Sequence, residues 1–237
     1  MELPYASCYC EENIYKACKT LHSDLKTASP DYFLFVVFIS SPTRAVPLFC
    51  QRSSRRQDGL VIWDYHVVLV KVLNDKTHVL DFDTIIQADN VQLNVRDGLR
   101  RVDFIQFDEY AELTFRHSWS LPENFRRRFR VISAQDYLSS FASDRSHMLV
   151  LDESGQSVYV KAPPPWPPIC GPIACTAGIL MNIDNFICMA DNDGNKLNDQ
   201  HGLEAYGMRF GEVLTEEQFL DRFSASPGDM HNIGHHE

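Results

Sequence analysis

Two apolar segments separated by three polar residues constrain the fold of this chain most strongly. The segments "LVIWDYHVVLVKVL" (60–73) and "THVLDFDTII" (77–86) are rich in β-branched and aromatic residues, and Asn74-Asp75-Lys76 lies between them. This composition and this turn sequence are typical of an antiparallel β-hairpin. We therefore expect a buried hairpin at the centre of a mainly antiparallel sheet.

The length of the hairpin loop decides which side chains of the two strands share a face. With an even loop, such as Asn74 and Asp75 alone, His66 lies opposite Asp83, and His66, Asp81 and Asp83 share one face. An odd loop would put the histidine and the aspartates on opposite faces. A buried imidazole and buried carboxylates need partners, so the even loop would allow them to satisfy one another.

The other elements predict an α/β protein of the α+β kind, with helices flanking the sheet. The 237 residues suit a single catalytic domain over 1–237, with a disordered tail from about residue 225. Ser133 and Asp136, like Thr215 and Gln218, are spaced as helix N-terminal caps. We expect strands in 31–40 and "AVPLFC", a hairpin over 148–160 turning at Ser154-Gly155, and helices after Cys10, after Ser133 and over 214–223.

The net charge and the cysteine content limit the binding partners and the cell compartment that we expect. The net charge of −10 argues against tight binding to nucleic acid or to an anionic membrane. The chain shows no secretory signal and no long apolar run, and seven scattered cysteines suit free thiols in a reducing compartment. We expect a monomer in the cytoplasm, with the nucleus as a second compartment.

The cysteines in "CYCEEN" allow two interpretations, a reactive thiol or a buried apolar side chain. Cys10 falls at the start of the predicted helix, where free backbone N–H groups and the helix dipole stabilise a thiolate and could stabilise an oxyanion. Cys8 fits a packing role better. Alternatively, Cys10 is a small buried hydrophobic residue, which is the commoner fate of a cysteine.

A zinc site is the main rival hypothesis for the cysteines. C-x-C is not a usual structural zinc spacing, and Cys175 stands in an apolar segment. We expect neither a metal nor a cofactor. The residues that such a site would draw on are Cys8, Cys10, Cys170 and Cys175, with His147 or His201.

A thiol at a helix start, followed by a histidine and an aspartate on adjacent strands, is the order of papain-like and transglutaminase-like Cys-His-Asp sites. In such sites the histidine takes the thiol proton and later protonates the leaving amine, while the aspartate orients the ring. Alternatively, His66 is a core histidine and the aspartates cap a strand end. The residue pattern alone leaves Asp81 and Asp83 equivalent.

Five segments resemble the cysteine-type protein N-terminal glutamine amidohydrolase family: "CYCEENIYKAC", "VIWDYHVVLV", "LDFDT", "FRRRFRVI" and "FASDRSHM". "PPPWPP", "MNIDNF" and "LTEEQFLDRF" extend the resemblance over most of the chain, whereas 87–110, 149–160, 190–207 and 170–180 differ. The resemblance implies a papain/transglutaminase-like fold and a triad of Cys10 as nucleophile, His66 as base and Asp81 as orienting carboxylate. It also implies deamidation of an N-terminal glutamine to glutamate through a thioester, feeding N-degron protein turnover.

Such a reaction requires recognition of a free α-amino group, for which carboxylates are suitable partners. Glu11, Glu12 and Asp64 are the nearest candidates, and Trp63 and Tyr65 could wall the pocket. Each of them could instead have a purely structural role. Two alternatives to the deamidase stay open: a transglutaminase-like or isopeptide-cleaving cysteine enzyme, and a non-catalytic binding module.

Overall fold

The predicted hairpin lies at the centre of the structure, a computed structural model that describes residues 1–25, 32–86, 95–96, 99–189 and 210–224. Strands β5 (His66–Leu73) and β6 (Lys76–Leu80) are joined by Asn74 and Asp75 alone, whose φ angles are 44° and 62°. These positive angles suit the tight turns of two-residue hairpins. The loop therefore has an even number of residues, which is the case in which His66 and the two aspartates were expected to share a face.

The hairpin belongs to a six-stranded sheet whose neighbouring strands are all antiparallel. The predicted strand over 31–40 is β2 (Tyr32–Ser40), which pairs along the full length of β5. The strand order is β15 (Glu212–Thr215), β10 (Arg128–Ser133), β2, β5, β6 and β9 (Ile105–Gln106). The mixed α/β architecture with a mainly antiparallel sheet is thus confirmed.

The first predicted strand of the hairpin is wrong in one respect, because it is interrupted. Residues Val61–Trp63 form β4, which pairs with β3 (Val46–Leu48) in a separate ribbon, and the sheet strand begins only at His66. At the break, the Ser40 hydroxyl donates to the Asp64 carbonyl at 2.6 Å. This crossing from one ribbon to the main sheet places His66 at a strand end.

The second predicted strand is too long, because β6 ends at Leu80. The Asp81 carboxylate accepts the backbone N–H of Asp83 at 2.9 Å, which turns the chain away from the sheet. The predicted pairing of His66 opposite Asp83 is therefore wrong. His66 instead meets Asp81 across the opened end of the hairpin.

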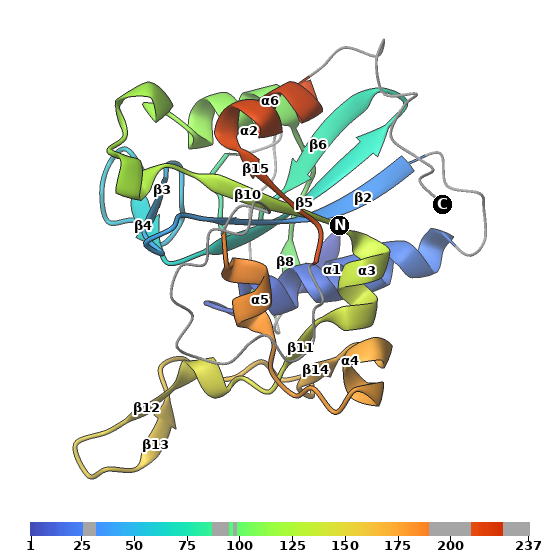
Figure 1. The fold of residues 1–237 in the computed structure, drawn as a ribbon, viewed down its shortest axis with the longest axis vertical. Helices are drawn as coiled ribbons and strands as arrows, with labels where there is room; N and C mark the ends of the chain where they lie inside the picture. Colours follow the sequence, from blue (N-terminus) through green and yellow to red (C-terminus); the bar gives the residue numbers. More distant parts are fainter. Residues whose placement is uncertain (26–31, 87–94, 97–98, 190–209, 225–237) are drawn as a thin grey trace.

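Helices cover both faces of the sheet (Figure 1). On one face lie α1 (Cys10–Leu25), α3 (Ala134–Ser140) and α5 (Ile183–Ile187), and on the other lie α2 (Phe107–Thr114) and α6 (Glu216–Ser224). Each face has its own buried apolar cluster. The repeat that predicted the first helix is confirmed, since Ile14, Ala17 and Cys18 are fully buried.

Both predicted helix caps are present. Ser133 accepts the N–H of Asp136 at 3.1 Å, and Thr215 and Gln218 exchange the two hydrogen bonds of a capping box. None of the helices in the described ranges has the length and apolar content needed to cross a membrane. The tail predicted from residue 225, the segment 190–207 and His201 lie outside the described residues.

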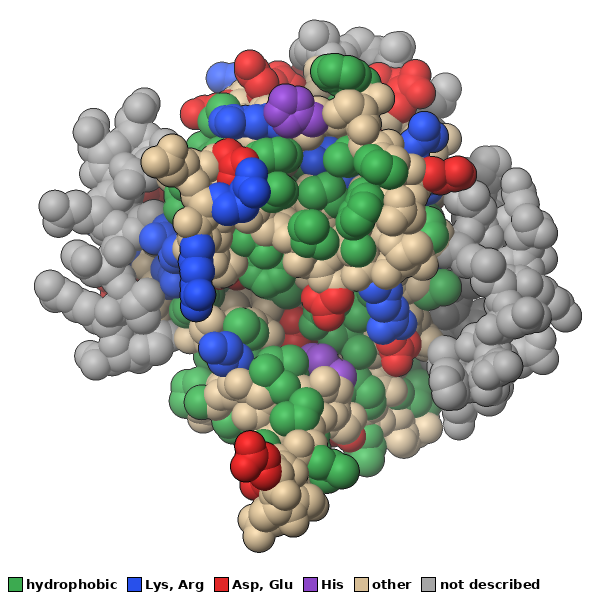
Figure 2. Space-filling view, turned by 90° about the vertical axis from the view of Figure 1, so that its left-hand side faces the viewer, with side chains coloured by type: hydrophobic (Ala, Val, Ile, Leu, Met, Phe, Trp, Pro, Cys, Tyr) green, Lys and Arg blue, Asp and Glu red, His purple; other side chains and the backbone are tan. Residues whose placement is uncertain are grey.

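The predicted hairpin over 148–160 is confirmed as β12 (Leu149–Leu151) and β13 (Ser157–Tyr159), which project from the body (Figures 1 and 2). The remaining short elements are β1 (Glu2–Pro4), β7 (Val95–Arg96), β8 (Leu99–Arg101), β11 (Ala142–Ser143), β14 (Ile169–Cys170), α4 (Pro172–Thr176) and three single-turn helices, Ser118–Ser120, Glu123–Phe125 and Ser146–Met148.

Candidate active site

Cys10 is the first residue of α1, where the helix meets the start of β5. The loop before it is held by the Asn13 side chain, which accepts the N–H of Ala6 at 2.8 Å and donates to the Ala6 carbonyl at 2.9 Å. Cys8 has a φ of 67° and is exposed, whereas Cys10 is only 9% exposed. The two cysteines of "CYC" therefore have different surroundings.

The electrostatics of Cys10 differ from those expected of a thiol at a helix start. Burial raises the pKa of the Cys10 thiol, and the carboxylates of Glu11, Asp83 and Asp64 raise it further. The backbone N–H of Val67 acts in the opposite direction, but its effect is smaller. Cys10 is therefore a protonated thiol in the resting protein, and a nearby base would have to remove its proton.

His66 directly precedes Val67 in the chain and is a candidate for that base. It forms a buried pair with Asp81. Its Nε2 donates to Asp81 Oδ1 at 2.8 Å, and both side chains are almost fully buried. Nδ1 is also buried, and no described residue hydrogen-bonds to it. Trp63 stacks on the ring at a centroid distance of 5.2 Å and shields the pair from water.

Asp81 raises the pKa of His66, and His66 lowers the pKa of Asp81. Burial is the largest single influence and lowers the pKa of His66, but Asp81, together with Asp83 and Glu11, outweighs it, so the pKa of His66 is raised above its usual value. Burial likewise raises the pKa of Asp81, while His66 and other hydrogen-bond donors lower it below its usual value. The ring thus keeps Nε2 protonated toward Asp81, which leaves Nδ1 as the free basic atom.

Two residues that the sequence did not indicate complete the setting of Asp81. The Tyr110 hydroxyl donates to Asp81 Oδ2 at 2.9 Å, and Gln51 Nε2 approaches the same oxygen at 3.5 Å. Gln51 also accepts the indole N–H of Trp63 at 3.2 Å. Tyr110 lies in a region without a clear pattern, and Gln51 begins a segment that looked like a solvated loop, so neither carried a signal.

Asp83, the other aspartate of "LDFDT", has different partners. It accepts the hydroxyl of Tyr5 at 2.8 Å and Arg100 Nη1 at 3.3 Å. Ligand atoms of His66, Asp81 and Asp83 lie within 4.8 Å of one another, as they would around a metal ion. Because tyrosine, guanidinium and imidazole donors already engage these carboxylates, the arrangement suits an acid–base pair better than a cation site.

Glu11 is a fully buried carboxylate next to Cys10. Its Oε2 accepts the hydroxyl of Tyr65 at 3.0 Å, whereas Oε1 has no hydrogen-bond partner among the described residues. Burial raises the pKa of Glu11 to about 7. His147 Nε2 lies 3.6 Å from Oε1, and burial lowers the pKa of His147. Oε1 is thus a buried acceptor beside Cys10 that His147 approaches without a hydrogen bond.

Glu12, although equally buried, is fully engaged. Its carboxylate accepts Nε and Nη2 of Arg145, each at 2.9 Å, and the indole N–H of Trp166 at 2.7 Å. Ser143 adds a weaker contact at 3.4 Å. Glu12 therefore ties the start of α1 to the segments around Arg145 and Trp166, and its charge is already neutralised.

Trp63, the last residue of β4, and the two residues between β4 and β5 lie around the same site. Trp63 covers His66, and Tyr65 stacks on Phe38 of the core while its hydroxyl holds Glu11. Asp64 is exposed, accepts the N–H of Tyr65 at 2.9 Å, and lies close enough to raise the pKa of Cys10. Aromatic walls and a surface carboxylate thus adjoin the thiol.

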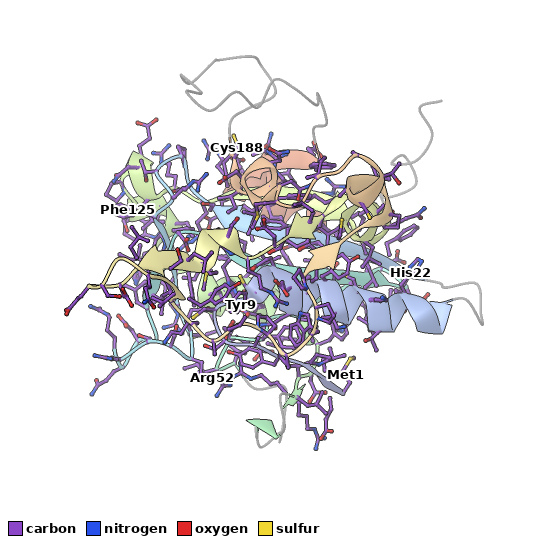
Figure 3. The ribbon with its side chains drawn as sticks, turned by 90° about the horizontal axis from the view of Figure 1, so that it is seen from below. Met1, Tyr9, His22, Arg52, Phe125 and Cys188 are labelled. Carbon is purple, nitrogen blue, oxygen red and sulfur yellow. The ribbon has the colours of Figure 1, made fainter. Side chains whose placement is uncertain are left out.

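The structure does not support the zinc hypothesis. All seven cysteines are free thiols. Within the described ranges, the one cluster of three or more potential metal ligands is the His66 group, which contains no cysteine. His147 lies beside Glu11 instead. Figure 3 shows Tyr9, the residue before Cys10, at one end of α1, with His22 toward the other end.

Comparison with known proteins shows which proteins this chain is similar to. The family described as N-terminal glutamine amidase matches residues 5–223. Protein N-terminal glutamine amidohydrolase of Homo sapiens is 35% identical over 222 residues, which cover 93% of this chain and 88% of that protein. The proteins of that name from Arabidopsis thaliana and Drosophila melanogaster are 33% and 32% identical, over 92% and 95% of this chain and 90% and 91% of theirs. This chain belongs to the N-terminal glutamine amidase family.

Proposed function

We propose that the protein hydrolyses the side-chain amide of an N-terminal glutamine in proteins and peptides, giving glutamate and ammonia, with Cys10 as nucleophile. The observation that carries this proposal is the state of His66: Nε2 is held by Asp81, and buried Nδ1 has no partner among the described residues. An imidazole oriented in this way, at the strand end where α1 begins, can take the proton of a thiol.

In the proposed reaction, His66 Nδ1 takes the proton of Cys10 as the sulfur attacks the γ-carboxamide carbon. The backbone N–H groups at the start of α1 face the developing oxyanion. His66 returns the proton to the departing nitrogen, so ammonia leaves and a thioester remains. A water molecule, deprotonated by His66, then hydrolyses the thioester to glutamate and regenerates the thiol.

We assign the recognition of the substrate's α-ammonium group to Glu11. Its Oε1 is a buried acceptor that has no hydrogen bond in the described part of the chain and only a 3.6 Å contact with His147, which is a costly arrangement unless a ligand supplies a donor. An ammonium ion there would also offset the charge that raises the pKa of Cys10. Substrate binding would thus make the thiol easier to deprotonate, and an acetylated N-terminus would not.

The neighbouring candidates take supporting roles in this proposal. Asp64 adds a second carboxylate at the surface, Tyr65 holds Glu11, and Trp63 shields His66. Glu12 positions the start of α1 through Arg145 and does not receive the substrate. Asp81 orients His66, while Tyr110 and Gln51 hold Asp81.

The same proposal includes a papain/transglutaminase-like arrangement of a single catalytic domain that acts as a monomer without metal or cofactor. The glutamate product is the kind of N-terminus that an N-degron pathway would use, in the cytoplasm or the nucleus. Protein or peptide substrates with N-terminal glutamine are its partners, and nucleic acid and membranes are not.

The test is ammonia release from three matched peptides that begin with glutamine, begin with N-acetylglutamine, or carry glutamine only at an internal position. The proposal expects release from the first alone. Release from the internal glutamine would favour a transglutaminase-like enzyme, and peptide-bond cleavage would favour an isopeptidase. No release, together with a thiol that does not react with iodoacetamide, would favour a binding module.

A further inference from the structure

The hairpin formed by β12 and β13 is unusually apolar for a projecting element. The exposed fractions are 40%, 47% and 72% for Leu149, Val150 and Leu151, and 39% and 40% for Val158 and Tyr159. Natural proteins usually place charges on exposed edge strands to prevent unwanted pairing, but neither strand carries one. A two-stranded hairpin with both faces exposed is also only marginally stable alone. Such a surface indicates a binding partner.

Both ends of this hairpin are attached beside Cys10. Before β12, His147 lies 3.6 Å from the Glu11 carboxylate. After β13, the Lys161 carbonyl accepts the hydroxyl of Tyr9 at 3.1 Å. The hairpin therefore rises from the rim of the proposed active site, and Figures 1 and 3 show it at the Tyr9 end of α1.

The two faces of the hairpin can be distinguished. Residues paired across antiparallel strands share a face, so Leu149 and Tyr159 lie with Leu151 on one side, and Val150 lies with Val158 on the other. Tyr159 is close enough to Tyr9 and Arg145 to influence the pKa of both side chains, although burial is the largest influence on Tyr9 and the hydrogen bond to Glu12 on Arg145. The face with Leu149, Leu151 and Tyr159 is thus the one whose tyrosine lies near Tyr9 and Arg145, both of which contact the segments around the start of α1.

We propose that this face, which we call the Leu151 face, binds the stretch of substrate polypeptide that follows the N-terminal glutamine. The inference rests on the proposed function, because a polypeptide whose first residue reaches Cys10 must leave along the rim. An extended segment with apolar side chains could pack on the Leu151 face and pair with an unpaired strand edge. Over the three residues of β12 the strand runs about 10 Å, so about three substrate residues could be bound.

The test compares kcat/KM for ammonia release from the dipeptide Gln-Gly and from a peptide of about ten residues with glutamine first and alternating leucines after it. In the wild-type protein we expect the long peptide to be favoured by roughly tenfold, as the burial of one apolar side chain would produce. Leu151→Ser should remove this preference without changing the dipeptide rate. Val150→Ser, on the opposite face of the same hairpin, should keep it.

Several outcomes would overturn the inference while leaving the proposed function intact. These are an equal rate on both substrates in the wild type, an unchanged preference in Leu151→Ser, or the same loss in Val150→Ser. A fall of the dipeptide rate in Leu151→Ser would show that the hairpin supports the site itself. A dimer that Leu151→Ser dissociates would show that a second copy covers the face. Absence of ammonia release from both substrates in the wild type would instead refute the proposed function.

Discussion

Replacing Glu11 by glutamine should make the protein more stable and less active at the same time. The carboxylate is fully buried, and its pKa is raised from 4.5 to about 7, with burial as the main cause. A raised pKa means that the folded state binds the proton more tightly than the unfolded state. The resulting stabilisation is complete below pH 4.5 and is lost as pH rises to about 7.

The magnitude follows from that shift. A shift of about 2.5 pKa units at about 1.4 kcal/mol each means that ionised Glu11 lowers the free energy of unfolding by roughly 3 kcal/mol above pH 7. Glutamine cannot ionise, and its carbonyl can still accept the Tyr65 hydroxyl. Urea unfolding at about pH 8 should therefore show Glu11→Gln to be more stable by up to about 3 kcal/mol. Near pH 4.5 the difference should nearly vanish.

The activity should change in the opposite direction. Loss of a charge-assisted hydrogen bond of about 1.5–3 kcal/mol should raise KM for glutamine peptides by roughly 10- to 100-fold. Because Glu11 raises the pKa of Cys10, the variant thiol should also react faster with iodoacetamide.

Glu12→Gln is the matched control, since Glu12 is equally buried but paired with Arg145. Breaking that pair should destabilise the protein by about 3–5 kcal/mol at pH 8. Destabilisation of the protein by Glu11→Gln to the same extent would show that ionised Glu11 does not lower the free energy of unfolding.

Three further predictions follow from the same contacts. Asp81→Asn should lower kcat by roughly 10²- to 10⁴-fold and lower the pKa of His66, and a change under about threefold in ammonia release would contradict its orienting role. The value of kcat/KM should rise with pH through about 7. The reason is that Glu11 must ionise to bind an ammonium group and that His66, whose pKa is raised, must lose its proton. In Glu11→Gln the part of this pH dependence that comes from Glu11 should disappear. Phe219→Ala should lower the free energy of unfolding in urea by about 3–5 kcal/mol without lowering activity. Phe219 is buried against Phe129 at a ring distance of 4.1 Å, on the face of the sheet opposite α1. Unchanged stability of this variant would contradict the prediction.

Local patterns were sufficient to predict the elements that carry the site. The apolar repeat after Cys10 predicted α1, and the turn sequence predicted the hairpin, whose even register the structure then showed. Both patterns depend on residues close in sequence. The ends of the strands were less predictable. The break at Asp64 arises because the residues before it pair with β3 in a separate ribbon, whereas those after it pair with β2 in the main sheet.

The electrostatics of the site could not be predicted from the sequence. A helix start suggests a stabilised thiolate, but burial and neighbouring carboxylates reverse that expectation for Cys10. Glu11 and Glu12 are adjacent and look equivalent, yet only Glu12 meets Arg145, which is 133 residues away in the chain. Distinguishing the carboxylate that has an unbonded oxygen, Glu11, from the one paired with arginine, Glu12, therefore required the tertiary structure.

The central claim is that Cys10 carries out the reaction, and Cys10→Ala tests it most directly. Cys10 is the first residue of α1, and among the described residues its thiol donates only a weak hydrogen bond, to Glu11 at 3.6 Å, so its loss should leave the fold intact by circular dichroism and urea unfolding. We expect this folded variant to release no ammonia from a peptide with N-terminal glutamine, while Cys8→Ala retains wild-type activity. Ammonia release by folded Cys10→Ala at the wild-type rate would show that Cys10 is not the nucleophile.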